Sequence, residues 1–173
     1  YLMGDSDQQL YEREEFELPD AVHIHCMDNF RSPRRVVHAI NELGLTDTPT
    51  EARSPYEGEL LGFHIYRDND SLIHETAEAI RALVQRGIPL DEIAVLSSHG
   101  LSKSKLMSLD QIEDITTRYF TGKFDKNGAP VWTQGAVLVD SIYRFKGQSA
   151  SGIVLAELDF TELGESVRRK LLV

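Results

Sequence analysis

A short basic turn between two apolar runs holds the residue types that best suit an anionic ligand. Residues 139–147 pass from apolar side chains to Arg144, Lys146 and Gly147, and a second apolar run covers residues 152–158. Two buried strands joined by such a turn are typical of an open parallel sheet, which binds ligands at the carboxyl ends of its strands. A lysine beside a glycine, with an arginine nearby, favours phosphate, nucleotide or nucleic-acid backbone. The alternative interpretation is an ordinary solvated surface turn.

Arg31 stands just before a predicted helix, at the end of a predicted strand. Ser32 is expected at the N-cap of this helix and Pro33 at its first position, and Gly44 is expected to end it. The guanidinium fork of an arginine at such a place can surround a phosphate, and a surface ion pair is the alternative. The apolar stripe of the helix is formed by Val36, Val37, Ile40 and Leu43.

Two further groups of residues suggest metal chemistry, and in both the simpler interpretation is favoured. Asp5 and Asp7 are two residues apart and could hold a metal ion, but a solvated turn explains them as well. His23, His25 and Cys26 lie on a predicted strand and suggest zinc. Because no second pair of ligands follows at zinc spacing, we interpret them as polar-face residues and expect no metal site.

The composition is that of an ordinary globular protein with one sizeable domain. The chain has 173 residues, of which 41% are hydrophobic and 27% charged. Its net charge of −10 argues against coating nucleic acid by bulk electrostatics, although a local basic groove remains compatible with it. The single cysteine excludes an internal disulfide and favours a reducing, cytoplasmic setting.

No apolar run approaches the roughly 20 residues that span a bilayer, and the N-terminus lacks the features of a signal peptide, so we expect no membrane partner. The chain has no initiator Met and stops within a helical pattern. We therefore interpret it as a piece of a larger protein.

Strand and helix patterns alternate along the chain. Residues 60–66 read as a strand, and Asp70 or Ser71 is expected to cap a helix that Gly87 ends. Ile93 to Leu96 is a continuous apolar run of the kind that a buried parallel strand shows. The stripe of the helix before it is formed by Ile73, Ala77, Ile80, Leu83 and Val84.

The second half of the chain adds a hairpin and a closing helix. Residues 101–115 are expected to be helical in part. Residues 116–120 and 131–133 flank Asp125-Lys126-Asn127-Gly128, which is a strong turn signal for a β-hairpin. Residues 161–173 are expected to form a helix. Together the patterns predict an α/β fold with a mainly parallel sheet flanked by helices.

Four segments, in this order, resemble motifs of the UvrD/Rep-type superfamily 1 helicases. Residues 4–11, Gly-Asp-Ser-Asp-Gln-Gln-Leu-Tyr, resemble the third motif of that family, and residues 29–32, Asn-Phe-Arg-Ser, resemble the fourth. Residues 93–96, Ile-Ala-Val-Leu, resemble a strand found in many relatives. Residues 141–147, Ser-Ile-Tyr-Arg-Phe-Lys-Gly, resemble the fifth motif. The resemblance covers most of the chain. It leaves out the hairpin and residues 45–59, which are expected to form a linker or surface loop.

The resemblance implies a RecA-like fold with a β-hairpin insertion. Residues 1–20 would lead from a preceding motor domain, and residues 21–173 would form the second RecA-like domain, truncated before the sixth motif. In this family ATP, with Mg²⁺, lies between two RecA-like domains, and closure around it moves the protein along single-stranded DNA. The implied partners are therefore single-stranded DNA and the first RecA-like domain of the same parent chain.

Roles follow residue by residue from the matched motifs. Gln8 would sense the γ-phosphate and couple it to DNA, and Arg31 would act on that phosphate as an arginine finger. Lys146 and Gly147 would lie beside the nucleotide. Phosphoryl transfer is catalysed mainly by positioning and charge stabilisation, so an arginine supplied on closure has a large effect. The residues implied at the DNA are Ser141, Tyr143 and Arg144.

The chain departs from the family pattern at several positions. Residues 12–15 are Glu-Arg-Glu-Glu where the family often has an aromatic and basic segment, which puts base stacking there in doubt. Lys146-Gly147-Gln148-Ser149 stands where the family has Lys-Gly-Leu-Glu, so the acidic residue near the nucleotide's sugar is absent, and Tyr143 replaces the usual His. The phosphate loop and the acidic second motif are missing altogether.

Three hypotheses remain at this stage. The first is a motor domain that completes an ATP site in a larger enzyme and is inactive alone. The second is a non-catalytic RecA-like module for protein interaction or regulation, which the altered fifth motif and the acidic surface favour. The third, least favoured, is a free-standing hydrolase that uses Asp5 and Asp7.

Overall fold

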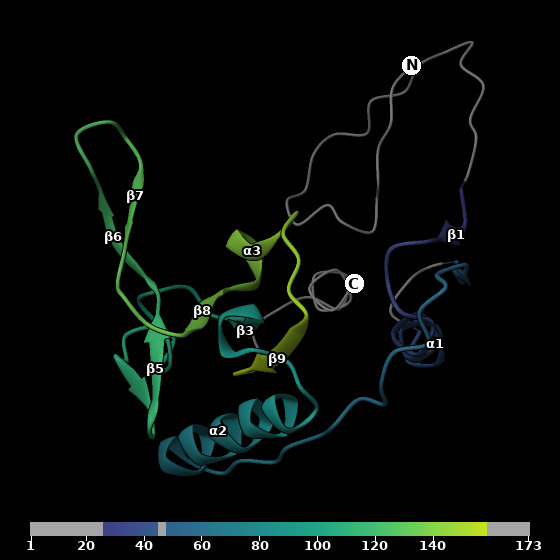
Figure 1. Cartoon of the computed structure of the whole chain (residues 1–173), viewed down its shortest axis with the longest axis horizontal. Coiled ribbons are helices and arrows are strands. Elements are labelled where there is room, and N and C mark those ends of the chain that lie inside the picture. The colour runs from purple at the N-terminus through teal and green to yellow at the C-terminus, as the bar shows by residue number, and fades with distance from the viewer. Residues whose placement is uncertain (1–25, 45–47, 159–173) are drawn as a thin grey trace. The chain divides into compact units, whose positions relative to one another are not determined.

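The computed structural model describes residues 26–44 and 48–158, shown coloured in Figure 1. These residues belong to two compact units, the first reaching Leu61 and the second starting at Gly62. The domain boundary expected at residue 20, the strand expected over residues 21–26 apart from Cys26, and the helix expected over residues 161–173 lie outside the described residues.

The first unit contains a short parallel strand pair and one helix. Strand β1 (Asp28–Asn29) pairs with β2 (Glu51–Ala52), and helix α1 (Arg34–Glu42) lies between them in the sequence. Val37 is the buried residue of α1. Asn41 bonds the backbone of Thr50 in both directions, at 2.8 and 3.0 Å, and so fixes the return from α1 to β2.

Helix α1 starts one residue later than the sequence predicts. Pro33 occupies the N-cap, without a side-chain capping bond, so the assignment of Ser32 to the cap was wrong. The backbone N–H groups of Arg31 and Ser32 instead donate to Asn29 Oδ1, at 3.0 and 2.8 Å. The first N–H groups of the helix, those of Arg34 and Arg35, donate to the carbonyls of Tyr56 and Glu57, so a serine cap is not needed. Gly44, with φ of 60°, follows the C-cap as predicted.

The second unit is built on a five-stranded, mainly parallel sheet. Central strand β3 pairs in parallel with β8 on one side and β9 on the other, β5 is parallel to β8, and β4 is antiparallel to β5. The predicted α/β class with a mainly parallel sheet is therefore confirmed. The strands are β3 (Ile93–Ser97), β4 (Gln111–Ile112), β5 (Ile115–Arg118), β8 (Val137–Ser141) and β9 (Gly152–Ala156).

Helices cover the two faces of this sheet (Figure 1). Helix α2 (Asn69–Gln85) packs Ala77 and Ile80 against the side of β3 that carries Ile93 and Val95. The short helix α3 (Ile142–Phe145) packs Phe145 on the other side, against Ala94 and Leu96. All five residues of β3 are buried, as expected for a parallel strand covered on both faces.

Helix α2 begins earlier than either predicted cap. Asp68 is the N-cap and Ser71 lies three residues on, and the two form a reciprocal capping box. The predicted caps, Asp70 and Ser71, were wrong because both lie inside the first turn. Gly87, with φ of 90°, follows the C-cap residue Arg86 as predicted, and a 3₁₀ turn, η1 (Leu90–Glu92), leads into β3.

Residues 60–66 do not form the predicted strand. The segment is irregular and exposed, with Phe63 81% and Ile65 84% accessible, and no described strand pairs with it. His64 Nδ1 lies 2.9 Å from Glu75 on α2. Residues 101–115 also lack the helix expected in part. They form turns and β4.

The predicted hairpin is present, with its first strand shifted. Strands β6 (Phe120–Phe124) and β7 (Pro130–Trp132) pair across the turn at Asp125, and they form an arm that extends from the sheet (Figure 1). The predicted strand over residues 116–120 is divided, because Thr117 and Arg118 pair with β8 in the main sheet. No helix within the described ranges has the length and apolarity to cross a bilayer.

Candidate functional site

The basic turn lies where the sequence placed it, at the carboxyl edge of the parallel sheet. Ser97 at the end of β3 is in register with Ser141 at the end of β8 and with Ala156 at the end of β9. The chain leaves β8 through α3 and reaches Lys146 directly afterwards. Parallel sheets bind ligands at this edge, so these strand ends define the candidate site.

Ser141 is a helix cap as well as a candidate ligand residue. It is only 4% exposed, and its hydroxyl accepts a hydrogen bond from the Arg144 backbone N–H at 3.3 Å, which caps α3. Its own N–H donates to Asp140 Oδ1 at 2.8 Å. These bonds fix the direction in which the chain turns after β8.

Asp140 is a buried carboxylate that the sequence did not single out. Asp140 is 1% exposed, and its Oδ1 lies 3.3 Å from Arg144 Nε. Its Oδ2 has no hydrogen-bond partner among the described residues. Burial raises the pKa of Asp140, and the Ser141 N–H and Arg144 oppose that shift. The signal in the sequence was an aspartate at the end of an otherwise apolar strand.

Arg144 links this carboxylate to the hairpin. Its guanidinium lies 3.7 Å from the centroid of the Phe120 ring and 5.3 Å from that of Trp132. The side chain is 35% exposed. An arginine between a carboxylate and two aromatic rings is held in one position, and only part of its guanidinium can reach a ligand.

Lys146, Gly147 and Tyr143 complete the turn. Lys146 is exposed, and its ammonium makes no ion pair with the residues that the structure describes. Gly147 has φ of 82° and open space where a Cβ would lie, so its conformation rather than close packing requires glycine. Tyr143 is half-buried. The exposed lysine of this turn is therefore Lys146.

A second buried carboxylate, Glu157, holds the neighbouring loop. It follows β9, is 4% exposed and has φ of 52°. Its Oε2 accepts from the hydroxyls of Ser97 and Ser104, each at 2.5 Å, and its Oε1 accepts from the Lys105 N–H at 2.6 Å. Its backbone carbonyl accepts from the Ser98 hydroxyl. The loop after β3 is thus fastened to the end of β9, and sequence reasoning missed this role.

Arg31 lies in the first unit, two residues beyond β1 and before α1, as predicted. The residue is exposed. The Arg34 and Arg35 N–H groups at the start of α1 donate to the carbonyls of Tyr56 and Glu57, at 2.9 and 3.0 Å. Because these amides are occupied, an anion at this place would be bound by side chains rather than by the helix terminus.

Gln8, Asp5, Asp7, His23 and His25 lie outside the described residues, and Cys26 is exposed. Within residues 26–44 and 48–158, no three His, Cys, Asp or Glu side chains gather as a metal site.

A hollow of about 470 Å³ lies away from the candidate edge. Its walls include Ile93, Ala94 and Leu138, which are at the amino-terminal ends of β3 and β8, together with Arg118 and Gln148. It does not contain Ser141, Lys146 or Glu157. Phe145 also lines the hollow, so the hollow borders the basic turn on one side.

The carboxyl edge of this sheet offers exposed lysines on two loops, Lys146 after β8 and Lys103 and Lys105 after β3, together with the partly exposed Arg144. This set can bind and orient an anionic oxygen. Comparisons of the chain with protein-family models, with curated proteins and with solved structures find no match.

Proposed function

We propose that the chain is the second RecA-like motor domain of an ATP-dependent DNA helicase or translocase. The observation that carries the proposal is the position of residues 141–147, whose sequence resembles the fifth helicase motif. They follow β8, which pairs in parallel with the central strand β3, and they bring the exposed Lys146 to the carboxyl edge. Phosphate ligands suit that edge of an α/β sheet.

In this proposal the chain supplies cations to a nucleotide held mainly by another domain. Lys146 approaches a phosphate as a point charge, and Arg31 approaches the γ-phosphate as a finger when the two motor domains close. Gln8 couples that phosphate to DNA. The chain has no phosphate loop and no acidic second motif, so the main nucleotide contacts and the carboxylates for Mg²⁺ belong to the first RecA-like domain.

The DNA side of the proposal uses the same turn. Tyr143 and Arg144 face single-stranded DNA at the start of α3, and Ser141 fixes the turn by capping that helix. Closure and opening of the ATP site then change the contacts of this turn with the strand.

Lys146→Ala tests the proposal in the full parent protein. We expect DNA-stimulated ATP hydrolysis to fall about tenfold or more, because one phosphate-binding cation is lost. Lys105→Ala is the matched control, since it removes an exposed lysine on the neighbouring loop and retains the backbone N–H bonded to Glu157. The isolated chain should show no ATPase above background. Substantial turnover by the isolated chain would refute the assignment.

The second candidate function is a non-catalytic interaction module. Ser141 is buried and Arg144 is engaged by Asp140 and Phe120, which leaves fewer groups for DNA. The sequence of the parent distinguishes the two functions. A phosphate loop upstream supports the motor, and its absence supports the module.

A further inference from the structure

The β6–β7 hairpin carries an exposed aromatic side chain on an aromatic base. Phe124 is 64% exposed, and its ring meets Phe120 edge-on with centroids 5.3 Å apart and an interplanar angle of 62°. Phe120 also lies 5.9 Å from Trp132. Gly122, between the two phenylalanines in the sequence, has φ of 78°, and a Cβ there would lie 3.3 Å from Leu101. The ring of Phe124 is thus supported from behind while much of its surface faces solvent.

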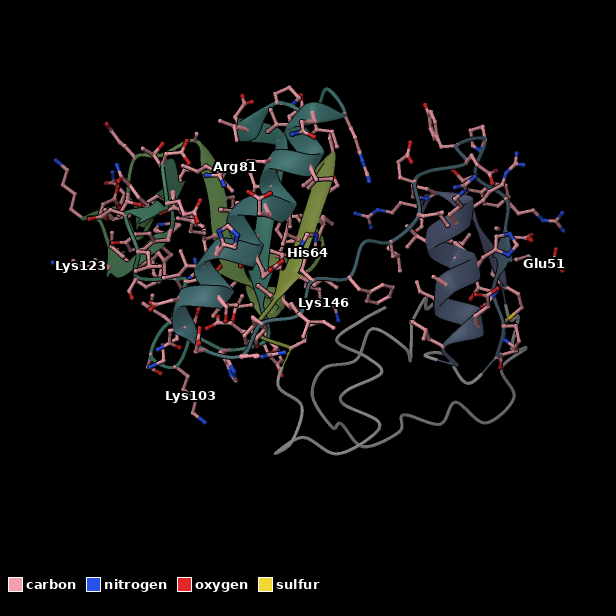
Figure 2. The ribbon with its side chains drawn as sticks, turned by 90° about the horizontal axis from the view of Figure 1, so that it is seen from below. Glu51, His64, Arg81, Lys103, Lys123 and Lys146 are labelled. Atoms are coloured by element: carbon pink, nitrogen blue, oxygen red, sulfur yellow. The ribbon has the colours of Figure 1, made fainter. Side chains whose placement is uncertain are left out.

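Two lysines lie within two residues of Phe124 in the sequence. Lys123 and Lys126 are exposed, and neither makes an ion pair with a described residue. Figure 2 shows the Lys123 side chain at the outer end of the hairpin, away from α2. The Asp125 carboxylate between them accepts from the Asn127 and Ala129 N–H groups, at 2.8 and 2.9 Å, and so shapes the turn.

The base of the hairpin is joined to the candidate site. Arg144 lies over Phe120, 3.7 Å from its centroid, and is paired with Asp140 at the end of β8. A cation among aromatic rings holds the hairpin against the turn that carries Lys146. The exposed ring, the two lysines and the candidate edge are therefore parts of one connected structure within the second unit.

We propose that the β6–β7 hairpin is a contact arm for single-stranded nucleic acid. Phe124 stacks on an unpaired base, and Lys123 and Lys126 neutralise adjacent phosphates. An aromatic platform beside cations is the arrangement that binds unpaired strands without reading their sequence. The ligand class rests on the proposed function. The location of the arm does not rest on that function, because the hairpin is not one of the segments that resemble helicase motifs.

The test measures binding of a labelled oligothymidylate of about 20 nucleotides to the 173-residue chain by fluorescence anisotropy at low salt. Phe124→Ala should weaken binding about fivefold or more, because one stacked base is lost. Lys123→Ala with Lys126→Ala should lower the slope of log affinity against log salt by about 1.4, the value for two phosphates on a single strand. A duplex of the same length should be insensitive to Phe124.

Matched controls come from the same unit. Phe63→Ala removes an aromatic ring that is 81% exposed, and Arg67→Ala with Arg86→Ala removes two exposed cations. Both should bind as the wild type does. Trp132 is the single tryptophan, so its fluorescence reports on the hairpin directly and should change on binding.

Two results would contradict the proposal that the hairpin is a contact arm. One is equal affinity of the wild type and the hairpin variants, and the other is no binding by the wild-type chain. The lysine variants keep this test valid if Phe124→Ala disturbs the hairpin, because both lysines are exposed. Neither result bears on the ATPase experiment with Lys146, so failure of the arm and failure of the motor function are distinguishable.

Discussion

Arg144 and Asp140 form an ion pair in which one partner is buried and the other lies over an aromatic ring. The Nε–Oδ1 distance is 3.3 Å, Asp140 is 1% exposed, and the Arg144 guanidinium is 3.7 Å from the Phe120 centroid. The pair joins the end of β8 to the β6–β7 hairpin. The position of the hairpin is therefore coupled to that of the turn that carries the candidate site.

Asp140→Asn should flatten the pH dependence of stability. Burial raises the pKa of Asp140 above its unfolded value, so the native state binds more protons between the two pKa values and stability falls as pH rises through that window. Asparagine keeps an Oδ1 acceptor for the Ser141 N–H and removes this term. Urea unfolding from about pH 3 to pH 8 measures it. An unchanged slope in the variant would show that Asp140 is not the responsible group.

Arg144→Met should loosen the hairpin more than Arg144→Lys. Methionine retains an apolar stem but leaves the Asp140 carboxylate without its cation, whereas lysine keeps the charge and loses the planar contact with Phe120. We expect about 0.5–1 kcal/mol of lost stability for lysine and more for methionine. Trp132 emission should shift in both variants. Identical emission and stability in all three proteins would contradict the coupling.

Glu157→Ala should strongly destabilise the second unit. The change leaves the hydroxyls of Ser97 and Ser104 and the Lys105 N–H without their acceptor. We expect a loss of about 3 kcal/mol or more in unfolding free energy, and a smaller loss for Glu157→Gln, which retains one acceptor oxygen. Asp91→Ala, at an exposed carboxylate, is the control and should stay within about 0.5 kcal/mol. Equal stability of the alanine variant and the wild type would mean that the loop after β3 is not held by Glu157.

His74→Gln should lower stability in mildly acidic solution and have little effect in alkaline solution. His74 donates a hydrogen bond to Glu113, with Nδ1 and Oε1 2.9 Å apart, and this bond raises the pKa of His74; the charges of Glu113, Glu78 and Glu75 add to the shift. Stability from protonated His74 is complete below its unfolded pKa and is lost as pH rises through the folded value. Urea unfolding at about pH 5.5 and pH 9 measures the difference. A loss of the same size at both values would contradict the ionic origin.

The main sheet was predictable because its strands have strong local signals. Residues 93–96 are a continuous apolar run and residues 137–139 are apolar before Asp140, and both segments form buried parallel strands. Gly87 also ended its helix as expected. Residues 60–66 carry an equally clear strand pattern and form none, because a strand also needs a partner and local pattern does not supply one.

The connections within the site were not predictable in the same way. Glu157 bonds Ser97, Ser104 and Lys105, which are more than 50 positions earlier in the chain, and no local pattern marks such bonds. Arg144 was predicted as a candidate for nucleic acid, and the ion pair with Asp140 and the contact with Phe120 appear only in three dimensions. The predicted N-caps were wrong by one to three positions, because α1 has no side-chain cap and because Asp68 caps α2 ahead of the nearby Asp70 and Ser71.

In the proposed motor function, the chain completes an ATP site by supplying Arg31 as an arginine finger. The direct measurement is the ATPase rate of the full parent protein, with and without single-stranded DNA, for the wild type, Arg31→Ala and the control Arg35→Ala. Arg35 lies four residues on and pairs with Glu57 at 3.4 Å. We expect DNA to stimulate turnover, and Arg31→Ala alone to reduce it about a thousandfold or more while the protein stays folded. Turnover that is absent, or that is indifferent to Arg31, would contradict the motor assignment.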